Sequence, residues 1–353
     1  MKILCVGPIW RGSNAGGLFK AMSRQGALIE VVDDFYHIPL SSKILKAKVI
    51  SKVFRKLFVD DFNHEIMDMV GKFNPDIVFV YKGGFVKAET LLYIKKTGIK
   101  LFNFYPDVSI HTHGNLLKHS LGYYDKIFTT KTFGLKDFKE QLGFTNTFFI
   151  PHGYDPEIHK PIRKDLIPAS FFCDVSFIGT YSPKKETILG RIIEKFPKID
   201  LKIWGTQWEK ASNPNLKNCI MNKGIFGDLY AAGISASKIN LGILSERVGA
   251  ASSGDLITSR TFHIPAAGGF LLHEKNEESI LYFKEAYEAD FFENVDQLLE
   301  KIGYYLENES ERNLIAERGL SRANKEHSLD QRAKIVLGHM VTDPVETIPL
   351  EKN

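Results

Sequence analysis

The segment from Cys173 to Thr206 reads CDVSFIGTYSPKKETILGRIIEKFPKIDLKIWGT and decides the fold. Two short apolar runs, 173–180 and 200–206, stand on either side of a helical pattern over 183–196. Each run is rich in β-branched and aromatic residues and reaches a glycine near its end, which is typical of buried strands in parallel sheets. A strand, a helix and a second strand in this order predict a βαβ unit with parallel strands.

The same alternation runs through most of the chain. Before residue 150, the strand-like runs KILCVG, LIEVVDD, DIVFVYKG, KLFNFYPD, DKIFTT and TFFIPHG alternate with helical patterns. The alternation pauses at 151–170, a segment with four prolines and many charges, and then resumes. The chain is therefore predicted to be α/β, with two Rossmann-like, doubly wound parallel-sheet domains joined by one linker.

The length of the chain agrees with this division, because 353 residues exceed what one ordinary core holds. We predict a first domain over 1–160 and a second domain over 161–327. A last helix over 328–340 is expected to cross back to the first domain. Residues 341–353 are expected to form a flexible tail.

Composition narrows the class of protein. Hydrophobic residues make up 44% and charged residues 25%, as in ordinary soluble proteins. A net charge of +4 suits an anionic ligand but is too small to indicate nucleic-acid binding. Three widely spaced cysteines favour a reducing cytosol. The chain lacks an 18-residue apolar run and a signal-peptide pattern, so we expect a cytoplasmic protein without a membrane span.

The first loop, GPIWRGSNAGGLFK, follows a strand and precedes a helix. Its glycines include Gly16 and Gly17. We take them as candidates for the glycine-lined wall of a ligand-binding cleft, next to a helix N-terminus. Plain turn chemistry is the alternative. The spacing departs from G-x-G-x-x-G, which argues against dinucleotide binding even though Asp33 and Asp34 follow at the distance of a ribose-binding acid.

A second loop, FYPDVSIHTHGN, leaves a strand end and carries Asp107, His111 and His113. A carboxylate and two imidazoles in one loop can supply a general base or orient a hydroxyl group. The H-x-H spacing also suits a metal, but the sequence offers no third ligand nearby. A polar loop with capping residues is the remaining interpretation.

Two strand ends of the second domain carry further candidates. Gly179 lets the chain turn close to a ligand, and Lys184 or Lys185 can meet a diphosphate. Trp204 and Gly205 end the next strand, where an aromatic ring can stack on a nucleobase. The alternatives are solvated lysines and a tryptophan in the core.

The segment SRTFHIPAAGGFLLHE, 259–274, places Arg260 in the first turn of a short helix. The positive helix end disfavours an arginine unless an anion lies there, so the pattern indicates an anion site. His263 shares the face of Arg260, and the glycines after it let the next strand approach closely. A tightly packed corner with an exposed arginine is the alternative.

An amphipathic, lysine-rich pattern covers 43–57. It fits a helix resting on an anionic membrane surface, and it fits equally a helix packed on its own domain with solvated lysines.

The second half of the chain resembles the spore-maturation-protein-like (CgeB-type) glycosyltransferases. The matching motifs are R-T-F-x-I-P-A-A-G, E-A-x-F-F and Y-Y-L-x-N followed by E-R and I-A-x-x-G; IPHGYDPEIHKP resembles the interdomain segment. The resemblance implies a GT-B fold, with two Rossmann-like domains facing across a cleft. It implies transfer of a sugar from a nucleotide diphosphate donor, with no metal required, and the sequence contains no D-x-D motif. It places Arg260, Thr261, Phe262, His263 and Gly268 at the donor site.

Two positions depart from the family pattern. His263 stands where a glutamate usually binds the ribose hydroxyls, and Leu256 replaces another glutamate. A histidine still offers one ring nitrogen for a hydrogen bond. The departures keep two other functions open: a non-catalytic GT-B-like binding module and a nucleotide-sugar epimerase. The expected partners are a nucleotide sugar as co-substrate and an acceptor that is a glycan, a protein or a small molecule.

Overall fold

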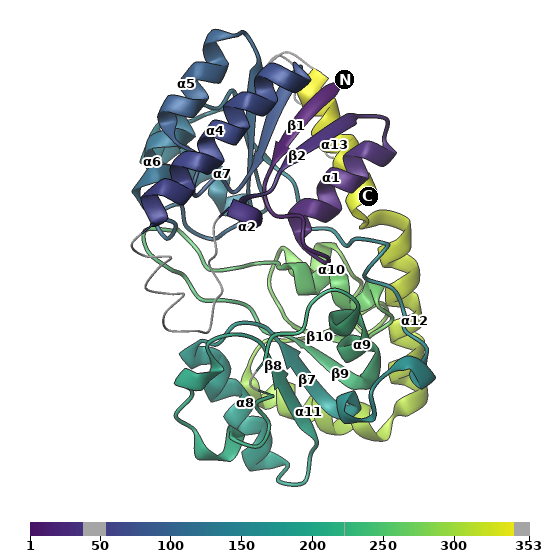
Figure 1. Cartoon of the computed structure of the whole chain (residues 1–353). Helices are drawn as coiled ribbons and strands as arrows, with labels where there is room; N and C mark the ends of the chain where they lie inside the picture. The colour runs from purple at the N-terminus through teal and green to yellow at the C-terminus, as the bar shows by residue number, and fades with distance from the viewer. Residues whose placement is uncertain (38–53, 222, 342–353) are drawn as a thin grey trace. The chain divides into compact units, whose positions relative to one another are not determined.

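The computed structural model describes residues 1–37, 54–221 and 223–341. The chain divides into two compact units (Figure 1). Unit 1 contains Met1–Pro151, Val248–Ser253 and Asp330–Asn353, and unit 2 contains His152–Arg247 and Gly254–Leu329. Both units are α/β domains with parallel sheets, so the predicted fold class is confirmed.

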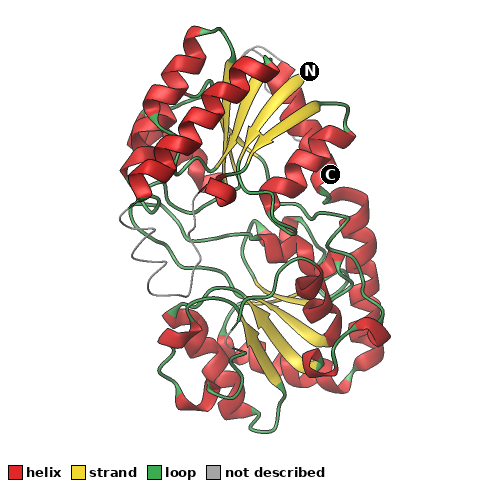
Figure 2. Cartoon of the chain, viewed as in Figure 1, coloured by secondary structure: helices red, strands yellow, loops and turns green. Residues whose placement is uncertain are grey.

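Unit 1 is built on a six-stranded sheet in the order β2-β1-β3-β4-β5-β6 (Figure 2). Every pair of neighbouring strands is parallel, with Ile3 opposite Ile77 as one register mark. The strands are β1 (Lys2–Val6), β2 (Leu28–Val32), β3 (Ile77–Tyr81), β4 (Lys100–Tyr105), β5 (Lys126–Thr129) and β6 (Thr147–Phe149). The helices are α1 (Asn14–Arg24), α2 (Asp34–His37), α4 (Arg55–Phe73), α5 (Ala88–Lys96), α6 (Asn115–Ser120), α7 (Thr132–Leu142) and α13 (Leu329–Val341), with the 3-10 turn η1 (Leu121–Tyr123).

Unit 2 has a five-stranded parallel sheet in the order β11-β10-β9-β7-β8. The strands are β7 (Cys173–Ile178), β8 (Leu201–Trp204), β9 (Ser237–Gly242), β10 (Leu271–Glu274) and β11 (Asp290–Phe292). The helices are α8 (Pro183–Lys195), α9 (Asp228–Ala236), α10 (Ser259–Ala266), α11 (Val295–Glu307) and α12 (Glu309–Glu326). The 3-10 turns are η2 (Lys164–Leu166), η3 (Ala169–Phe171), η4 (Trp208–Lys210), η5 (Pro214–Leu216) and η6 (Ser279–Leu281).

The βαβ unit at 173–206 forms because its strands and helix satisfy local rules. β7 is buried along nearly its whole length and pairs with both β8 and β9, so it lies in the interior of the sheet. Ser182 caps α8 by accepting a hydrogen bond from the Lys185 backbone amide, and Pro183 occupies the first helical position, where its missing N–H costs nothing.

The chain passes from one unit to the other at two places near the predicted boundaries. Residues 152–160, assigned above to the first domain, group with unit 2, where the backbone of Tyr154 exchanges hydrogen bonds with His327 and Leu329. Helix α13 groups with unit 1 from Asp330 onward; Asp330 binds Arg24 at 2.7 Å. Residues 342–353 of the predicted tail lie outside the described residues.

A short segment of the β9–α10 connection, 248–253, also belongs to unit 1. The Ser252 backbone amide donates to the Asp137 carboxylate at 2.9 Å, and Gln141 Nε2 donates to the Ala250 carbonyl oxygen at 2.8 Å. Asp137 and Gln141 both lie on α7, so this segment packs against that helix.

The strand orders place one switch point in each sheet. In unit 1 the chain leaves β1 first toward β2 and then returns to β3 on its other side. In unit 2 it leaves β7 toward β8 and returns to β9 on the other side. Loops that follow these strands diverge, and in doubly wound sheets ligands bind at the carboxyl ends beside such points.

The backbone is closely packed at Gly205, just after β8 in unit 2. Its φ is +148°, and a Cβ atom would lie 1.9 Å from the Gly179 carbonyl oxygen. Gly205→Ala is therefore expected to lower the free energy of unfolding by roughly 2–4 kcal/mol, because the backbone must shift. Urea denaturation measures this. Gly71→Ala in α4 is the control, because no atom lies within 4 Å of its added methyl group; it is expected to leave stability equal or higher. A Gly205→Ala protein as stable as the parent would contradict the packing.

Candidate functional site

Arg260 lies at the switch point of the unit 2 sheet. It stands in the first turn of α10, and its Nη2 donates to the Ile243 carbonyl oxygen at 2.7 Å, just beyond the end of β9. Its Nη1 reaches the carbonyl oxygen of Ile178, the last residue of β7, at 3.4 Å. The guanidinium carbon lies 5.2 Å from the centre of the Phe177 ring. Arg260 is thus fixed by the two central strands at the edge where ligands bind in this type of sheet.

Lys185 is a second cation at the same place. Its Nζ donates to the Thr180 carbonyl oxygen at 3.2 Å and to Ser245 Oγ at 3.1 Å, and it lies 5.9 Å from the Phe177 ring centre. Burial, together with the positive charge of Arg260, lowers the pKa of Lys185 to about 8. Two cations therefore meet around one aromatic ring.

The guanidinium of Arg260 has unused hydrogen-bonding capacity. Its buried Nε has no hydrogen-bond partner among the described residues. Burial lowers the pKa of Arg260, while the negative charges of Asp255 and Glu274 oppose that change. An anion that accepts hydrogen bonds from Arg260 and Lys185 would use the unpaired Nε of Arg260. It would also offset the cost of burying the positive charge.

Lys184 has a different position from its neighbour. Its Nζ binds the Glu274 carboxylate at 2.8 Å and donates to the Leu244 carbonyl oxygen. Of the two lysines considered from sequence, Lys185 is the one beside Arg260. A helix turns by about 100° per residue, so adjacent residues point in different directions.

Gly179 and Gly205 give Arg260 its space. A Cβ atom on Gly179 would lie 2.8 Å from Arg260 Nη1, and one on Gly205 would strike the Gly179 carbonyl oxygen. That oxygen accepts a hydrogen bond from Trp208 Nε1 at 2.9 Å. These glycines therefore permit the backbone of both strand ends to pack beside the arginine.

Three predicted donor-site residues are part of the core instead. Trp204 is 0% exposed and packs on Phe171 at 5.6 Å between ring centres, so it offers no face to a nucleobase. Phe262 is fully buried beside Phe283. Thr261 is fully buried, closes a capping box with Thr258 and bonds His273 Nε2 at 2.9 Å. In each case the side chain is buried inside unit 2, which one strand end or one short helix cannot reveal from its sequence.

His263 is also buried, which corrects its expected contact with ribose. Its ring stacks on His159 with 3.7 Å between centres, and its Nε2 lies 3.2 Å from the Gly153 carbonyl oxygen. Tyr230 packs edge-on against both rings. Burial, with the charges of the neighbouring histidines, holds the pKa of His263 well below its ordinary value. The histidine thus joins α10 to the 152–159 segment.

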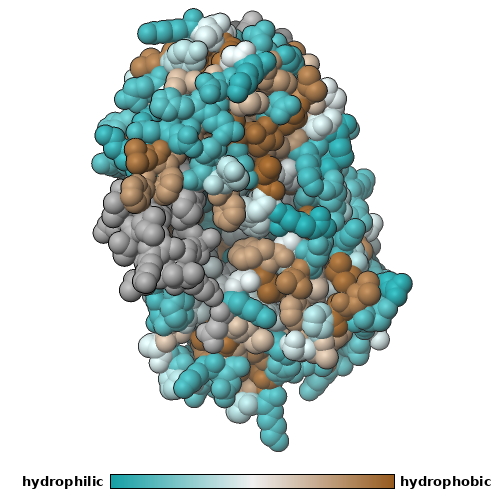
Figure 3. Space-filling view, in the orientation of Figure 1, coloured by the Kyte–Doolittle hydropathy of each residue, from teal (hydrophilic) through white to brown (hydrophobic). Residues whose placement is uncertain are grey.

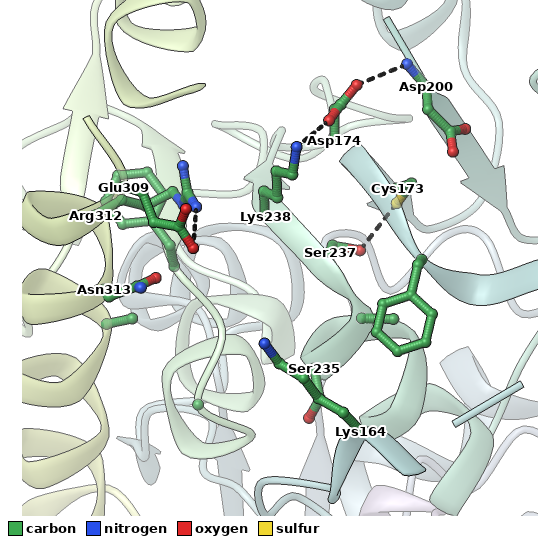
Figure 4. Close-up of a pocket in the computed structure, with 15 residues that line it drawn as sticks. Lys164, Cys173, Asp174, Asp200, Ser235, Ser237, Lys238, Glu309, Arg312 and Asn313 are labelled. Carbon is green, nitrogen blue, oxygen red and sulfur yellow. Dashed lines mark hydrogen bonds and ion pairs between the residues drawn. The ribbon is translucent and has the colours of Figure 1, made fainter. Parts of the chain in front are cut away.

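Gly268 lies at the opposite edge of the sheet from Arg260. It has φ +74°, and a Cβ atom would lie 3.1 Å from Pro161. It lines a cavity together with Cys173 and Ser237, the first residues of β7 and β9 (Figure 4). Gly268 therefore does not shape the Arg260 site, because α10 runs from one edge of the sheet to the other.

In unit 1, the glycine loop is closed by its own side chains. Ser13 Oγ accepts a hydrogen bond from the Gly16 amide at 2.9 Å, and the Ser13 carbonyl oxygen accepts one from Gly17. A Cβ on Gly16 would lie 2.8 Å from Ser13 Oγ. These contacts favour the turn and capping alternative for Gly16 and Gly17 over a phosphate site.

The polar loop of unit 1 forms a compact charged cluster. Asp107 Oδ2 lies 2.8 Å from His113 Nε2 and 2.7 Å from Lys82 Nζ. Burial alone would raise the pKa of Asp107, but the hydrogen bond from His113 and the charge of Lys82 hold it below its ordinary value. Asp107 is therefore an ionised carboxylate that orients the His113 ring.

His111 is separate from this cluster. Its Nε2 pairs with Gln141 Oε1 at 2.7 Å, so it takes part in the packing of α7. Among residues 1–37, 54–221 and 223–341, no group of three or more His, Cys, Asp or Glu side chains has a metal-holding arrangement.

The sequence analysis did not identify Lys82 as a partner of Asp107. It also did not distinguish Lys185 from Lys184 as the lysine of the donor site. Lys82 directly follows β3 and has φ +67°, an unusual backbone conformation for a lysine. The signal was available in the sequence YKGG, which places a lysine at a strand end before two glycines.

One family model matches part of the chain. Residues 184–338 match a family model described as glycosyl transferase-like, a range that includes Lys185 and Arg260. No curated protein matches the chain.

Solved structures show the same fold over nearly the whole chain. Sucrose-phosphate synthase from Thermosynechococcus elongatus has a TM-score of 0.63 at 12% identity, covering 96% of this chain and 98% of its own. A glycosyltransferase from Rickettsia africae has a TM-score of 0.63 at 14% identity, covering 96% of this chain and 97% of its own. Anabaena HepE in complex with UDP-glucose has a TM-score of 0.63 at 11% identity, with 96% and 99% covered. These likenesses show that the chain has the GT-B fold.

The described part of the chain has no helix that is both long and apolar enough to cross a membrane. On the visible face, hydrophobic residues gather in small groups separated by hydrophilic ones (Figure 3). The amphipathic pattern at 43–57 falls largely on 38–53, outside the described residues.

The buried histidines of unit 2 predict how stability depends on pH. Burial lowers the pKa of His159 and of His273 from 6.5 to about 4. Between these values the unfolded chain binds protons that the folded chain excludes, so the free energy of unfolding should fall as pH falls from about 6.5 to about 4. His159→Phe keeps a flat ring and removes one titrating group.

Urea denaturation at several pH values measures the effect. We expect His159→Phe to reduce the slope in this window by up to about 1.4 kcal/mol per pH unit, the value for one proton. The exposed residue His119 provides the control, because His119→Ala should leave the slope unchanged. An unchanged slope in His159→Phe would refute the assignment.

Proposed function

We propose that this protein transfers a sugar from a nucleotide diphosphate donor to an acceptor, without a required metal ion. The observation that carries the proposal is the pairing of Arg260 and Lys185 at the switch point of the glycosyltransferase-like domain. Two adjacent cations, Lys185 buried and Arg260 half-buried, favour an anion beside them, and a diphosphate carries two or more negative charges.

The donor chemistry follows from these charges. As the bond between the anomeric carbon and the diphosphate oxygen breaks, its electron pair stays on the diphosphate. Arg260 and Lys185 are fixed before the reaction, so they stabilise this charge without reorganising. Protein cations thereby fill the role that a divalent ion has in metal-dependent transfer, which supports the proposal that no metal is required.

The acceptor chemistry is assigned to unit 1. The acceptor hydroxyl loses a proton as its oxygen bonds to the anomeric carbon, and His113 is the proposed base. Asp107 holds the His113 ring through Nε2 and stabilises its protonated form, while Lys82 keeps Asp107 ionised. The acceptor is a glycan, a protein or a small molecule; a net charge of +4 gives no support for nucleic acid.

Narrower features belong to the same proposal. The motifs around Arg260 support a CgeB-type glycosyltransferase within the wider family. The cysteines Cys5, Cys173 and Cys219 are buried free thiols, which suits the reducing cytosol. Contact of 43–57 with an anionic membrane would bring the enzyme to a lipid-linked acceptor, and rests on the sequence pattern alone.

Arg260→Ala and Lys185→Met test the donor site. Each variant removes one cation, so each should weaken binding of the preferred nucleotide at least tenfold. Thermal shift with UDP, GDP, dTDP and CMP identifies the nucleotide and measures the loss. Lys195→Met, an exposed lysine on the same α8 helix, is the matched control and should bind like the parent. Equal binding in parent and Arg260→Ala would remove Arg260 from the donor site.

His113→Ala and Asp107→Asn test the acceptor site. Loss of the base in His113→Ala should lower kcat by about 10²–10⁴-fold. Asp107→Asn should also move the pH profile of kcat, because the new asparagine beside His113 carries no charge. His119→Ala is the exposed control. Transfer assays with the nucleotide sugar identified above measure both. Product formed without an acceptor would indicate an epimerase, and nucleotide binding with no turnover over many acceptors would indicate a binding module.

A further inference from the structure

The cavity beside Gly268 lies in unit 2 at the amino-terminal edge of its sheet. Its volume is about 490 Å³, within the range of small-molecule sites. It is lined by the first residues of β7 and β9, by the first two turns of α12 and by η2 (Figure 4). Gly268 at the far end of α10 also lines it. The cavity is therefore separated from Arg260 by the length of that helix, about 12 Å for eight residues.

Arg312 contributes a buried positive charge to this cavity. Its side chain is 4% exposed, and Nη1 donates to the Tyr305 carbonyl oxygen. The nearest carboxylate, Glu309, lies 3.8 Å from Nη2 and is itself 73% exposed. A buried guanidinium with one backbone bond and a distant, solvated counterion is incompletely compensated.

The other two acids that line the cavity, Asp174 and Asp200, are paired with lysines. Asp174 binds Lys238 at 2.7 Å and accepts from the Asp200 amide at 3.0 Å. Asp200 in turn binds Lys202 at 3.0 Å. Both carboxylates are thus neutralised by lysines. Lys164 on η2 has no ion pair among the described residues and lines the cavity. Lys164 is therefore without a paired acid, and Arg312 has only the solvated Glu309 at 3.8 Å and the weaker attraction of Asp174.

We propose that this cavity binds a small organic anion, a phosphate monoester or a carboxylate of metabolite size. Its charged group would lie between Arg312 and Lys164, where a forked guanidinium and a mobile ammonium can both donate. Its neutral part would contact Phe172 and Asn313, which also line the cavity. This site is distinct from the donor site and does not depend on the proposed transferase function.

Thermal shift with glucose 6-phosphate, citrate and glucose tests the proposal. Glucose 6-phosphate represents the phosphate monoester and citrate the carboxylate, and glucose is the neutral control. At least one anion should raise Tm in the parent protein, and glucose should not. Lys164→Glu should weaken that anion at least tenfold, because it reverses an exposed charge without disturbing the core. Lys160→Glu, an exposed lysine that does not line the cavity, should bind like the parent.

Arg260→Ala separates this site from the donor site. The shift caused by the anion should persist in Arg260→Ala, although the nucleotide shift is lost there. Arg312→Met should lose the anion shift, and if it folds poorly the Lys164→Glu result decides. The proposal is overturned if neither anion shifts Tm, if glucose shifts it equally, if Lys164→Glu binds like the parent, or if Arg260→Ala abolishes the anion shift.

Discussion

The contact of the Arg260 guanidinium with the carbonyl ends of β7 and β9 is the constraint on which the unit 2 site depends. Strand ends carry carbonyl oxygens that the sheet ladder no longer uses, and one arginine satisfies two of them. The arginine is thereby held rigidly where the strands diverge. Gly179 and Gly205 are required because any side chain there would displace it or the adjacent backbone. A fixed cation at a switch point is a prepared anion site rather than a flexible surface charge.

The same anchoring creates an electrostatic cost. Lys185 is held close to Arg260 by Thr180 and Ser245, so two positive charges share a partly buried environment. Burial lowers the pKa of both groups, and the charge of Arg260 lowers the pKa of Lys185 further. Stability of this arrangement improves when an anion binds, which links ligand affinity to the fold itself. The aromatic ring of Phe177 between them offsets part of the cost through its negative face.

Helix α10 connects this site to the rest of unit 2 through buried polar contacts. Thr261 bonds His273, and His263 stacks on His159 from the segment that leaves unit 1. His263 therefore serves packing here, and a charged carboxylate at this position could not be buried against the His159 ring without large cost. Unit 1 uses a comparable device, in which Lys82 and His113 share one ionised aspartate.

The sequence by itself determined the strand and helix alternation, the two parallel-sheet domains, Arg260 in a first helical turn and the loop that holds Asp107 and His113. These follow from apolar periodicity, glycine and proline positions and capping residues, which act over a few neighbours. Only the tertiary structure decided that Lys185 rather than Lys184 faces Arg260, that Trp204, Phe262 and His263 are buried, and that Gly268 lies at the other edge. Those outcomes depend on which side of a strand or helix meets residues far away in the chain. A short strand end and an eight-residue helix carry too few residues for their periodicity to fix that orientation.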